Sequence, residues 1–136
     1  MILIDPMSRK PIYDQLTEKI EQLILAGVYP ADTQLPSVRS LSCSLSVNPN
    51  TIQKAYTQLC NNGIAYSVAG KGCFVSPRAL TVLNERARAH LPEFRQMVAR
   101  LMDSGISPGE LKNLIDKTAS ERSGSNDPVN GINQTI

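Results

Sequence analysis

The sequence has no tryptophan, and aromatic residues make up only 4% of its 136 residues. Hydrophobic residues still reach 41%, so any core has to be built mainly from aliphatic side chains. No run approaches the roughly 20 apolar residues that cross a bilayer. The short apolar start, Met1–Ile4, meets Asp5 and Pro6 too early for a signal sequence. We therefore expect a cytoplasmic protein that does not associate with a membrane.

Cysteine and histidine are also scarce. The three cysteines, Cys43, Cys60 and Cys73, are an odd number without Cys-x-x-Cys spacing, which argues against a disulfide framework or a zinc site. Redox sensing is a sharper alternative, but the sequence places no cation beside these sulfurs, so three inert thiols are the default interpretation. The single histidine, His90, has no nucleophile or metal-ligand spacing around it. The sequence therefore predicts neither an enzyme nor a bound metal or cofactor.

Neither sign of charge is in large excess. The 14 Lys and Arg residues against 12 Asp and Glu residues give a formal net charge of +2. Domains that bind nucleic acids commonly carry a strongly basic patch or stripe. Here such a surface has to come from the local placement of a few cations, because the composition alone does not indicate it.

Apolar residues at helical spacing predict two helices before Ser46. The first covers residues 11–26, and its acidic residues, Glu21 among them, are expected to face solvent. Gly27 is the expected end of this helix. The second helix runs from about residue 36 to 45, and a tight turn through Ser46 follows it.

The third predicted helix has two strong start signals. Asn48 is a good N-cap and Pro49 a good first helical residue, while Gly63 offers the positive φ that helix ends favour. The period then changes to two short β-prone runs, 64–68 and 73–76, joined by a glycine-rich hairpin tip. Three helices followed by a hairpin predict a small α+β, mostly α, domain.

The C-terminal part has the pattern of a surface for a second copy of the chain. Residues 79–102 carry an apolar stripe that is long for so short a protein and has few partners inside it. Pro92 interrupts the stripe, so a kink or break is expected near residues 89–91. A last short helix is capped by Ser107 and ends near Thr118. The residues expected at the dimer interface are Leu80, Leu83, Ala87, Leu91, Phe94, Val98 and Leu101.

The polar side of the third helix suits the major groove of DNA. An α-helix fits that groove, and side chains near its N-terminus reach the base edges. Asn and Gln can pair with adenine, Thr offers a hydroxyl and a methyl, and Lys reaches phosphate or guanine. A lysine between two glycines at the hairpin tip suits a phosphate or a minor groove. The candidate DNA contacts are Ser37, Arg39, Asn48, Asn50, Thr51, Gln53, Lys54, Gly70 and Lys71.

Each of these features also has a simpler explanation. A polar helix face is most often only solvated, and a Gly-Lys-Gly hairpin tip is most often only a turn. Arg39 could serve a surface ion pair, and an apolar stripe is more often internal core than interface. The order of the elements favours the functional interpretation: a helix, a Leu-Pro-Ser helix, a tight turn, a capped polar helix and a glycine-tipped hairpin.

That order resembles the N-terminal domain of the GntR family of bacterial transcription regulators, which is a winged helix-turn-helix. The matching segments are PIYDQ at 11–15, LPSVRSL at 35–41, VNPNTIQKAY at 47–56 and GKGCFV at 70–75. The short remainder is similar to the YtrA-type branch, which implies that the C-terminal helices serve dimerisation. The resemblance also implies DNA contacts from Arg39, the start of the third helix and the wing. In the family, glycine is common near the position of Asp32 and frequent at the turn position of Ser46.

The sequence thus predicts a DNA-binding domain at 1–77, a two-helix dimerisation region at 78–119 and a disordered tail at 120–136. The leading hypothesis is a homodimeric repressor that binds double-stranded DNA at an inverted-repeat operator through its third helix and wing. The alternative is a winged-helix dimer that binds a protein partner without sequence-specific DNA binding, which the near-neutral charge favours mildly. A small-molecule effector is compatible with the chain, but the sequence indicates no chemistry for it.

Overall fold

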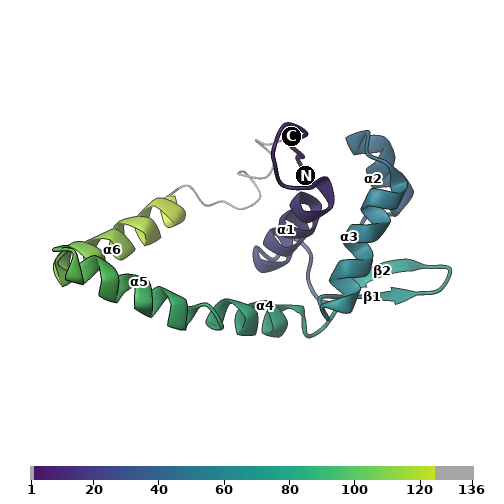
Figure 1. The fold of residues 1–136 in the computed structure, drawn as a ribbon. Helices are drawn as coiled ribbons and strands as arrows, with labels where there is room; N and C mark the ends of the chain where they lie inside the picture. The colour runs from purple at the N-terminus through teal and green to yellow at the C-terminus, as the bar shows by residue number, and fades with distance from the viewer. Residues whose placement is uncertain (1, 125–136) are drawn as a thin grey trace.

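The computed structural model describes residues 2–124, which form six helices and a two-stranded antiparallel sheet (Figure 1). This confirms the predicted α+β, mostly helical, winged helix-turn-helix architecture. None of the helices among residues 2–124 is long and apolar enough to cross a membrane. In chain order the elements are α1 (Ile12–Leu25), α2 (Val38–Leu45), α3 (Pro49–Asn61), β1 (Ala65–Val68), β2 (Gly72–Val75), α4 (Ala79–Arg88), α5 (Leu91–Asp103) and α6 (Pro108–Gly124).

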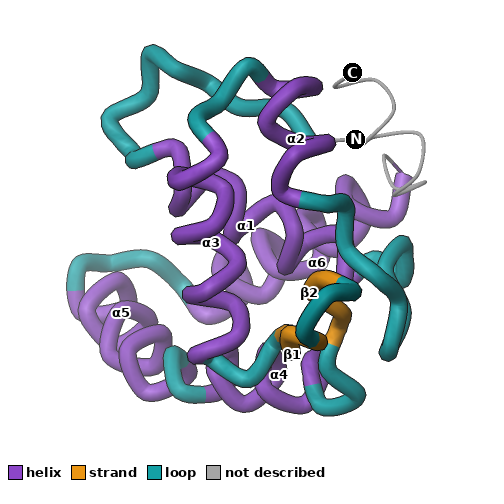
Figure 2. The backbone as a smooth tube through the Cα atoms, turned by 90° about the vertical axis from the view of Figure 1, so that its right-hand side faces the viewer, coloured by secondary structure: helices purple, strands orange, loops and turns teal. Residues whose placement is uncertain are grey.

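The core lies between α1, α2, α3 and the hairpin, and it is aliphatic as the composition predicted. Figure 2 shows α1 and α3 near each other, with the strands at the C-terminal end of α3. The side chains of Leu16 and Ile20 from α1 meet those of Ile52 and Leu59 from α3, and all four are fully buried. Val75 of β2 closes the same core, so the hairpin is fixed to the helices rather than free.

The hairpin is also tied to the chain that precedes α2. Strands β1 and β2 pair in register from Ala65–Val75 to Val68–Gly72. The Leu35 N–H donates to the Cys73 carbonyl at 2.8 Å. Next to this bond, Gln34 forms an isolated antiparallel β-bridge with Phe74. These bonds give β2 a neighbour on its outer side, which holds the wing beside the start of α2.

Capping explains where α2 and α3 begin. The Ser37 hydroxyl accepts a hydrogen bond from the Ser40 N–H at 3.0 Å, so α2 begins at Val38, after the predicted start. The Asn48 side-chain oxygen accepts from the Asn50 N–H at 2.8 Å, which confirms the predicted N-cap. A capping side chain satisfies one of the free amides of the first helical turn.

The turn between α2 and α3 passes through Ser46 in the left-handed region, at φ 55°. This conformation costs a non-glycine residue about 1–2 kcal/mol, whereas glycine adopts it freely at a smaller entropic cost. We expect Ser46→Gly to raise the free energy of unfolding by about 0.5–1 kcal/mol, measured by urea denaturation. The matched control is Ser44→Gly inside α2, which should lower it by a similar amount. Equal effects of the two changes would contradict this account.

One residue of α1 differs from the prediction. The sequence predicts that Glu21 faces solvent, but in the structure Glu21 is only 8% exposed. Its carboxylate pairs with the guanidinium of Arg86 on α4. Because a buried carboxylate needs a partner, the contact of α4 with α1 explains both its burial and its charge.

The C-terminal region forms an arm that leaves the three-helix unit and turns back between α5 and α6 (Figure 1). The first turns of α4 still belong to the domain core, since Ala79 and Leu83 are buried there. The predicted break is confirmed: α4 ends at Arg88, and α5 begins at Leu91 with Pro92 in its first turn, where the missing N–H is tolerated. The arm therefore contains three helical segments, not two.

Helix α6 is longer than predicted. The Ser107 hydroxyl caps it by accepting from the Glu110 N–H at 3.1 Å, as expected. The helix passes Thr118 and includes residues 120–124, which were predicted as part of a disordered tail. Glu121 and Arg122 favour a helix, and the helix continues through Ser120, Ser123 and Gly124 although no apolar periodicity remains there. A prediction from apolar periodicity therefore ends this helix too early. Residues 125–136, the rest of the predicted tail, lie outside the described residues.

Candidate nucleic-acid interface

The N-terminal half of α3 presents a polar edge. Ile52, Ala55, Tyr56 and Leu59 face the core, which leaves the other side of the helix outward. The predicted contacts Asn48, Asn50, Gln53 and Lys54 are exposed, and Thr51 is half-buried. The amides of this first turn are already used, because Pro49 has no N–H, the Asn50 N–H is capped by Asn48, and the Thr51 N–H donates to the Asn48 carbonyl at 3.0 Å. The side chains, rather than the backbone, are therefore the groups that this edge offers.

Helix α2 contributes two of the predicted residues beside that edge. Arg39 and Ser37 are both exposed near the start of the helix. The Ser37 oxygen accepts one hydrogen bond as the N-cap, which leaves its hydroxyl proton and one lone pair for a ligand. Asn48 is similarly occupied, which leaves its amide NH₂ for a ligand. Both residues therefore define where α2 and α3 begin.

The wing tip has the backbone geometry that its glycines require. Gly70 and Gly72 have φ of 75° and 115°, and the Lys71 N–H closes the turn onto the Val68 carbonyl at 2.9 Å. The Gln34 side-chain amide donates to the Lys71 carbonyl at 2.7 Å. A Cβ at Gly72 would lie 3.1 Å from that same Gln34 nitrogen. Gln34 thus holds the tip of the wing by a side-chain hydrogen bond, a role that the sequence did not predict.

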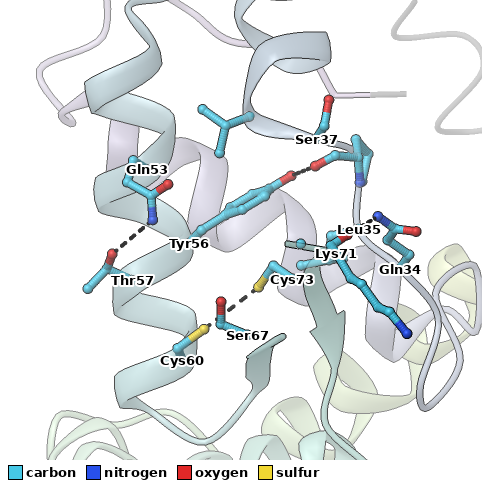
Figure 3. Close-up of a pocket in the computed structure, with 13 residues that line it drawn as sticks. Gln34, Leu35, Ser37, Gln53, Tyr56, Thr57, Cys60, Ser67, Lys71 and Cys73 are labelled. Atoms are coloured by element: carbon cyan, nitrogen blue, oxygen red, sulfur yellow. Dashed lines mark hydrogen bonds between the residues drawn. The ribbon is translucent and has the colours of Figure 1, made fainter. Parts of the chain in front are cut away.

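Between α3 and the wing lies a hollow of about 360 Å³ (Figure 3). Gln53 and Thr57 border it from α3, and Ser67 and Lys71 border it from the hairpin. Figure 3 shows Lys71 extending away from α3 toward the outside. Thr57 lies four residues after Gln53 and its hydroxyl is 3.3 Å from the Gln53 amide, so helical spacing could have identified it. Ser67 carries no comparable signal in the sequence.

Tyr56 forms part of the lining of this hollow. Its hydroxyl donates to the Pro36 carbonyl, which joins α3 to the start of α2. Burial, together with nearby Cys73 and Tyr29, raises the pKa of the Tyr56 phenol well above its ordinary value. The phenol therefore stays neutral and serves as a hydrogen-bond donor that fixes the angle between the two helices.

Lys54 is exposed as predicted, and the structure adds a partner for it that the sequence did not indicate. Its ammonium sits 4.0 Å from the centre of the Tyr13 ring at the start of α1. A cation over an aromatic face is attracted to the ring. The charge of Lys54 is thus held at the junction of α1 and α3, which suits a backbone phosphate better than a base edge.

The residues predicted for the dimer interface divide into two groups. Leu91 and Phe94 are 54% and 52% exposed, and none of the residues of α5 is buried. Leu80 and Ala87 are exposed as well, while Val98 and Leu101 are half-buried. Leu83 is different: it is 5% exposed and packs in the core of its own domain. The prediction for Leu83 is therefore corrected, since the contact of α4 with α1 takes that side of the helix.

Comparison with known proteins agrees with this architecture. The family model for "Bacterial regulatory proteins, gntR family" matches residues 12–75. The HTH-type transcriptional repressor YtrA of Bacillus subtilis (strain 168) is 37% identical over 114 residues, which are 84% of this chain and 86% of that protein. The similarity to YtrA therefore extends beyond the family segment into the C-terminal arm.

Two solved structures have similar folds. A GntR family transcriptional regulator from Listeria monocytogenes superposes with a TM-score of 0.67 at 34% identity, over 81% of this chain and 96% of that one. AraR(DBD) in complex with operator ORX1 superposes with a TM-score of 0.50 at 34% identity, over 54% of this chain and 92% of that one. With similarity in sequence and in fold over most of its length, the chain belongs to the GntR family of bacterial regulatory proteins.

Proposed function

We propose that this protein is a homodimeric, sequence-specific DNA-binding transcriptional repressor. The observation that carries the proposal is the exposed polar edge of α3 beside a wing whose tip presents Lys71. A duplex that takes the start of α3 in its major groove brings a phosphate strand or a minor groove toward the wing. The names of relatives support this assignment, because YtrA is a transcriptional repressor and AraR(DBD) was solved with an operator.

The polar residues on this side are proposed to have two roles: neutral amides recognise bases, and cations contact phosphates. Asn50 and Gln53 carry neutral amides that can pair in two-bonded fashion with adenine. Arg39, Lys54 and Lys71 are the cations near them, and a cation can neutralise a phosphate. The remaining predicted contacts are proposed for the same face, with Ser37 and Asn48 acting from the helix starts. A net charge of only +2 is then sufficient, because the cations are local.

The second copy of the chain is proposed to cover the arm. Leu91, Phe94, Val98 and Leu101 step by three or four residues along α5, so they share one side of that helix. Exposed Leu114 and Ile115 of α6 extend the apolar surface. An apolar surface of this kind is stabilised by burial, and a two-fold dimer uses the same patch twice. We accordingly assign residues 1–77 to DNA binding and 78–119 to dimerisation.

A two-fold dimer presents two copies of α3, so the operator is proposed to be an inverted repeat. Its half-sites would lie about one helical turn apart, roughly 10 base pairs from centre to centre. The test is selection of bound sequences from random DNA, with the mass of the free protein measured by light scattering. A recovered palindrome and a dimer mass are the expected results. Recovery of no shared sequence would refute this proposal and favour the winged-helix dimer that binds a protein partner.

The wing contact predicts a specific change in salt dependence. Lys71→Ala should weaken binding to all DNA sequences alike and lower the slope of log affinity against log salt by about 0.9, as expected for one lost phosphate contact. Binding is measured by fluorescence anisotropy between low and moderate salt. The control is Lys112→Ala on α6, an exposed lysine of the arm, which should leave the slope unchanged. An unchanged slope in the Lys71 variant would refute the wing contact.

A cytoplasmic location follows from the proposed role at DNA. A small-molecule effector is also proposed to be compatible with this role. Its detection would require a shift in operator affinity on adding candidate ligands, because no convergent polar set identifies its chemistry.

A further inference from the structure

Two of the three cysteines lie side by side between α3 and the wing. The sulfur atoms of Cys60 on α3 and Cys73 on β2 are 3.7 Å apart (Figure 3). Cys60 is half-buried and Cys73 is buried, and both line the hollow that opens between the helix and the hairpin. The sequence did not predict this pair, because Cys60 and Cys73 are 13 positions apart and become neighbours only in the folded chain.

We propose that Cys60 and Cys73 are a redox-modification site: a low-molecular-weight disulfide converts them to an intramolecular disulfide, and this bond weakens DNA binding. The effect on DNA rests on the proposed function, whereas formation of the bond does not. The third cysteine, Cys43, is exposed on α2 and is not part of the pair. The proposal replaces the default interpretation of three inert thiols for two of them.

The chemistry proceeds by two thiol–disulfide exchanges. The more accessible Cys60 loses its proton and attacks one sulfur of glutathione disulfide, which forms a mixed disulfide and releases one glutathione. Cys73 then loses its proton and attacks the sulfur of Cys60, which releases the second glutathione. Two protein thiols are oxidised and one glutathione disulfide is reduced to two thiols, so atoms and electrons balance.

The surroundings of Cys73 set the pace of the second step. Burial and the neighbouring Cys60 thiol raise the pKa of the Cys73 thiol to about 12. Only a small fraction of this thiol is ionised at neutral pH, and the thiolate is the attacking form. The exchange is therefore slow, and Cys60 reacts first because it is the more accessible of the two.

The new bond would alter the geometry of the DNA-facing side. The two sulfurs have to approach from 3.7 Å to about 2.0 Å, the length of a disulfide bond. Cys60 lies in the last turn of α3, and Cys73 follows Gly72, next to the tip of the wing. The bond draws β2 toward α3 and fixes the wing against the helix. The wing and α3 then no longer have the relative position that lets both contact the same duplex.

The test uses full-length protein carrying Cys43→Ser, incubated for hours in glutathione buffers from fully reducing to fully oxidising. We expect a mass loss of two hydrogens, a peptide linking Cys60 to Cys73 and protection of both from alkylation. The Tm should rise by about 10 °C, because a closed loop of this length restricts the unfolded chain. Affinity for the selected operator should fall at least about fivefold, the equivalent of one lost contact, and return on reduction.

Two variants serve as controls, and each should keep its operator affinity in oxidising buffer. Cys60→Ser prevents the disulfide but keeps the buried Cys73 in the core. A result with this variant therefore reflects the missing bond and not a change in core packing. Cys73→Ser should instead stop at a mixed disulfide on Cys60. The proposal is overturned if the oxidised protein keeps both thiols free, if glutathione remains on Cys60 in the parent protein, or if the disulfide forms without a change in affinity. Reduced protein that binds no DNA refutes the proposed function, while the thiol mapping is read independently.

Discussion

Replacing Phe94 by Asp is expected to dissociate the proposed dimer and to lower operator affinity by at least about 100-fold, because a monomer engages only one half-site. Phe94 lies in the N-terminal part of α5 and is 52% exposed, on a helix that buries no residue within its own chain. A carboxylate there would have to be buried against apolar side chains of the second copy, without a partner for its charge. Light scattering gives the mass and anisotropy gives the affinity.

The matched control for this change is Gln96→Asp on the same helix. Gln96 is exposed and lies two residues from Phe94, about 200° around the helix, so it introduces the same charge on the opposite side. It should remain dimeric and keep its affinity. Far-UV circular dichroism should show the same helix content for both variants. A Phe94→Asp protein that stays dimeric would refute the proposed interface.

Much of the DNA-facing side follows from local sequence rules. The N-cap at Asn48 with Pro49 after it fixes the start of α3, and the apolar spacing from Ile52 onward fixes which side is outward. The family resemblance also indicated two backbone positions with positive φ, because glycine is frequent near both of them in the family. These positions, Asp32 and Ser46, are the two non-glycine residues among 2–124 with positive φ. The backbone conformation was thus predictable from the resemblance even where the residue differed.

What could not be predicted depends on contacts between segments distant in sequence. Gln34 braces Lys71 across 37 positions, and Tyr66 of β1 donates to Asp32 at 2.8 Å. The position of Lys54 over Tyr13 depends on how α1 crosses α3. Periodicity reports which side of a helix is apolar, but it does not report which polar residue of one element meets which residue of another.

The Glu21–Arg86 pair has the same long-range origin, and its consequence is larger. Helix α4 connects the domain that carries α3 to α5, where the second copy is proposed to bind. The ion pair and the burial of Leu83 hold α4 against α1. In a two-fold dimer this contact therefore sets the direction in which each α3 points. Specificity for the spacing of half-sites would depend on it.

Arg86→Met tests this role, and we expect it to lower the free energy of unfolding by about 2 kcal/mol and the Tm by about 10 °C. Methionine keeps the aliphatic part of the side chain, but it leaves the carboxylate of Glu21, whose side chain is 10% exposed, without its cation. The expected loss is less than for a fully buried pair, because the Arg86 side chain is 45% exposed and solvent screens it. Thermal and urea denaturation measure both values.

The control for position and helix is Arg88→Met. Arg88 is exposed and bonds only its helix neighbour Asn84 at 2.9 Å among the described residues, so the change should stay within about 0.5 kcal/mol. Adding Glu21→Gln to Arg86→Met removes the unpaired charge and should restore part of the stability. In operator binding, Arg86→Met should reduce the preference for the correct half-site spacing over one lengthened by insertion, since α4 is no longer held at one angle to α1. If Arg86→Met and Arg88→Met were equally stable and equally selective for spacing, the pair would have no part in orienting the two copies of α3.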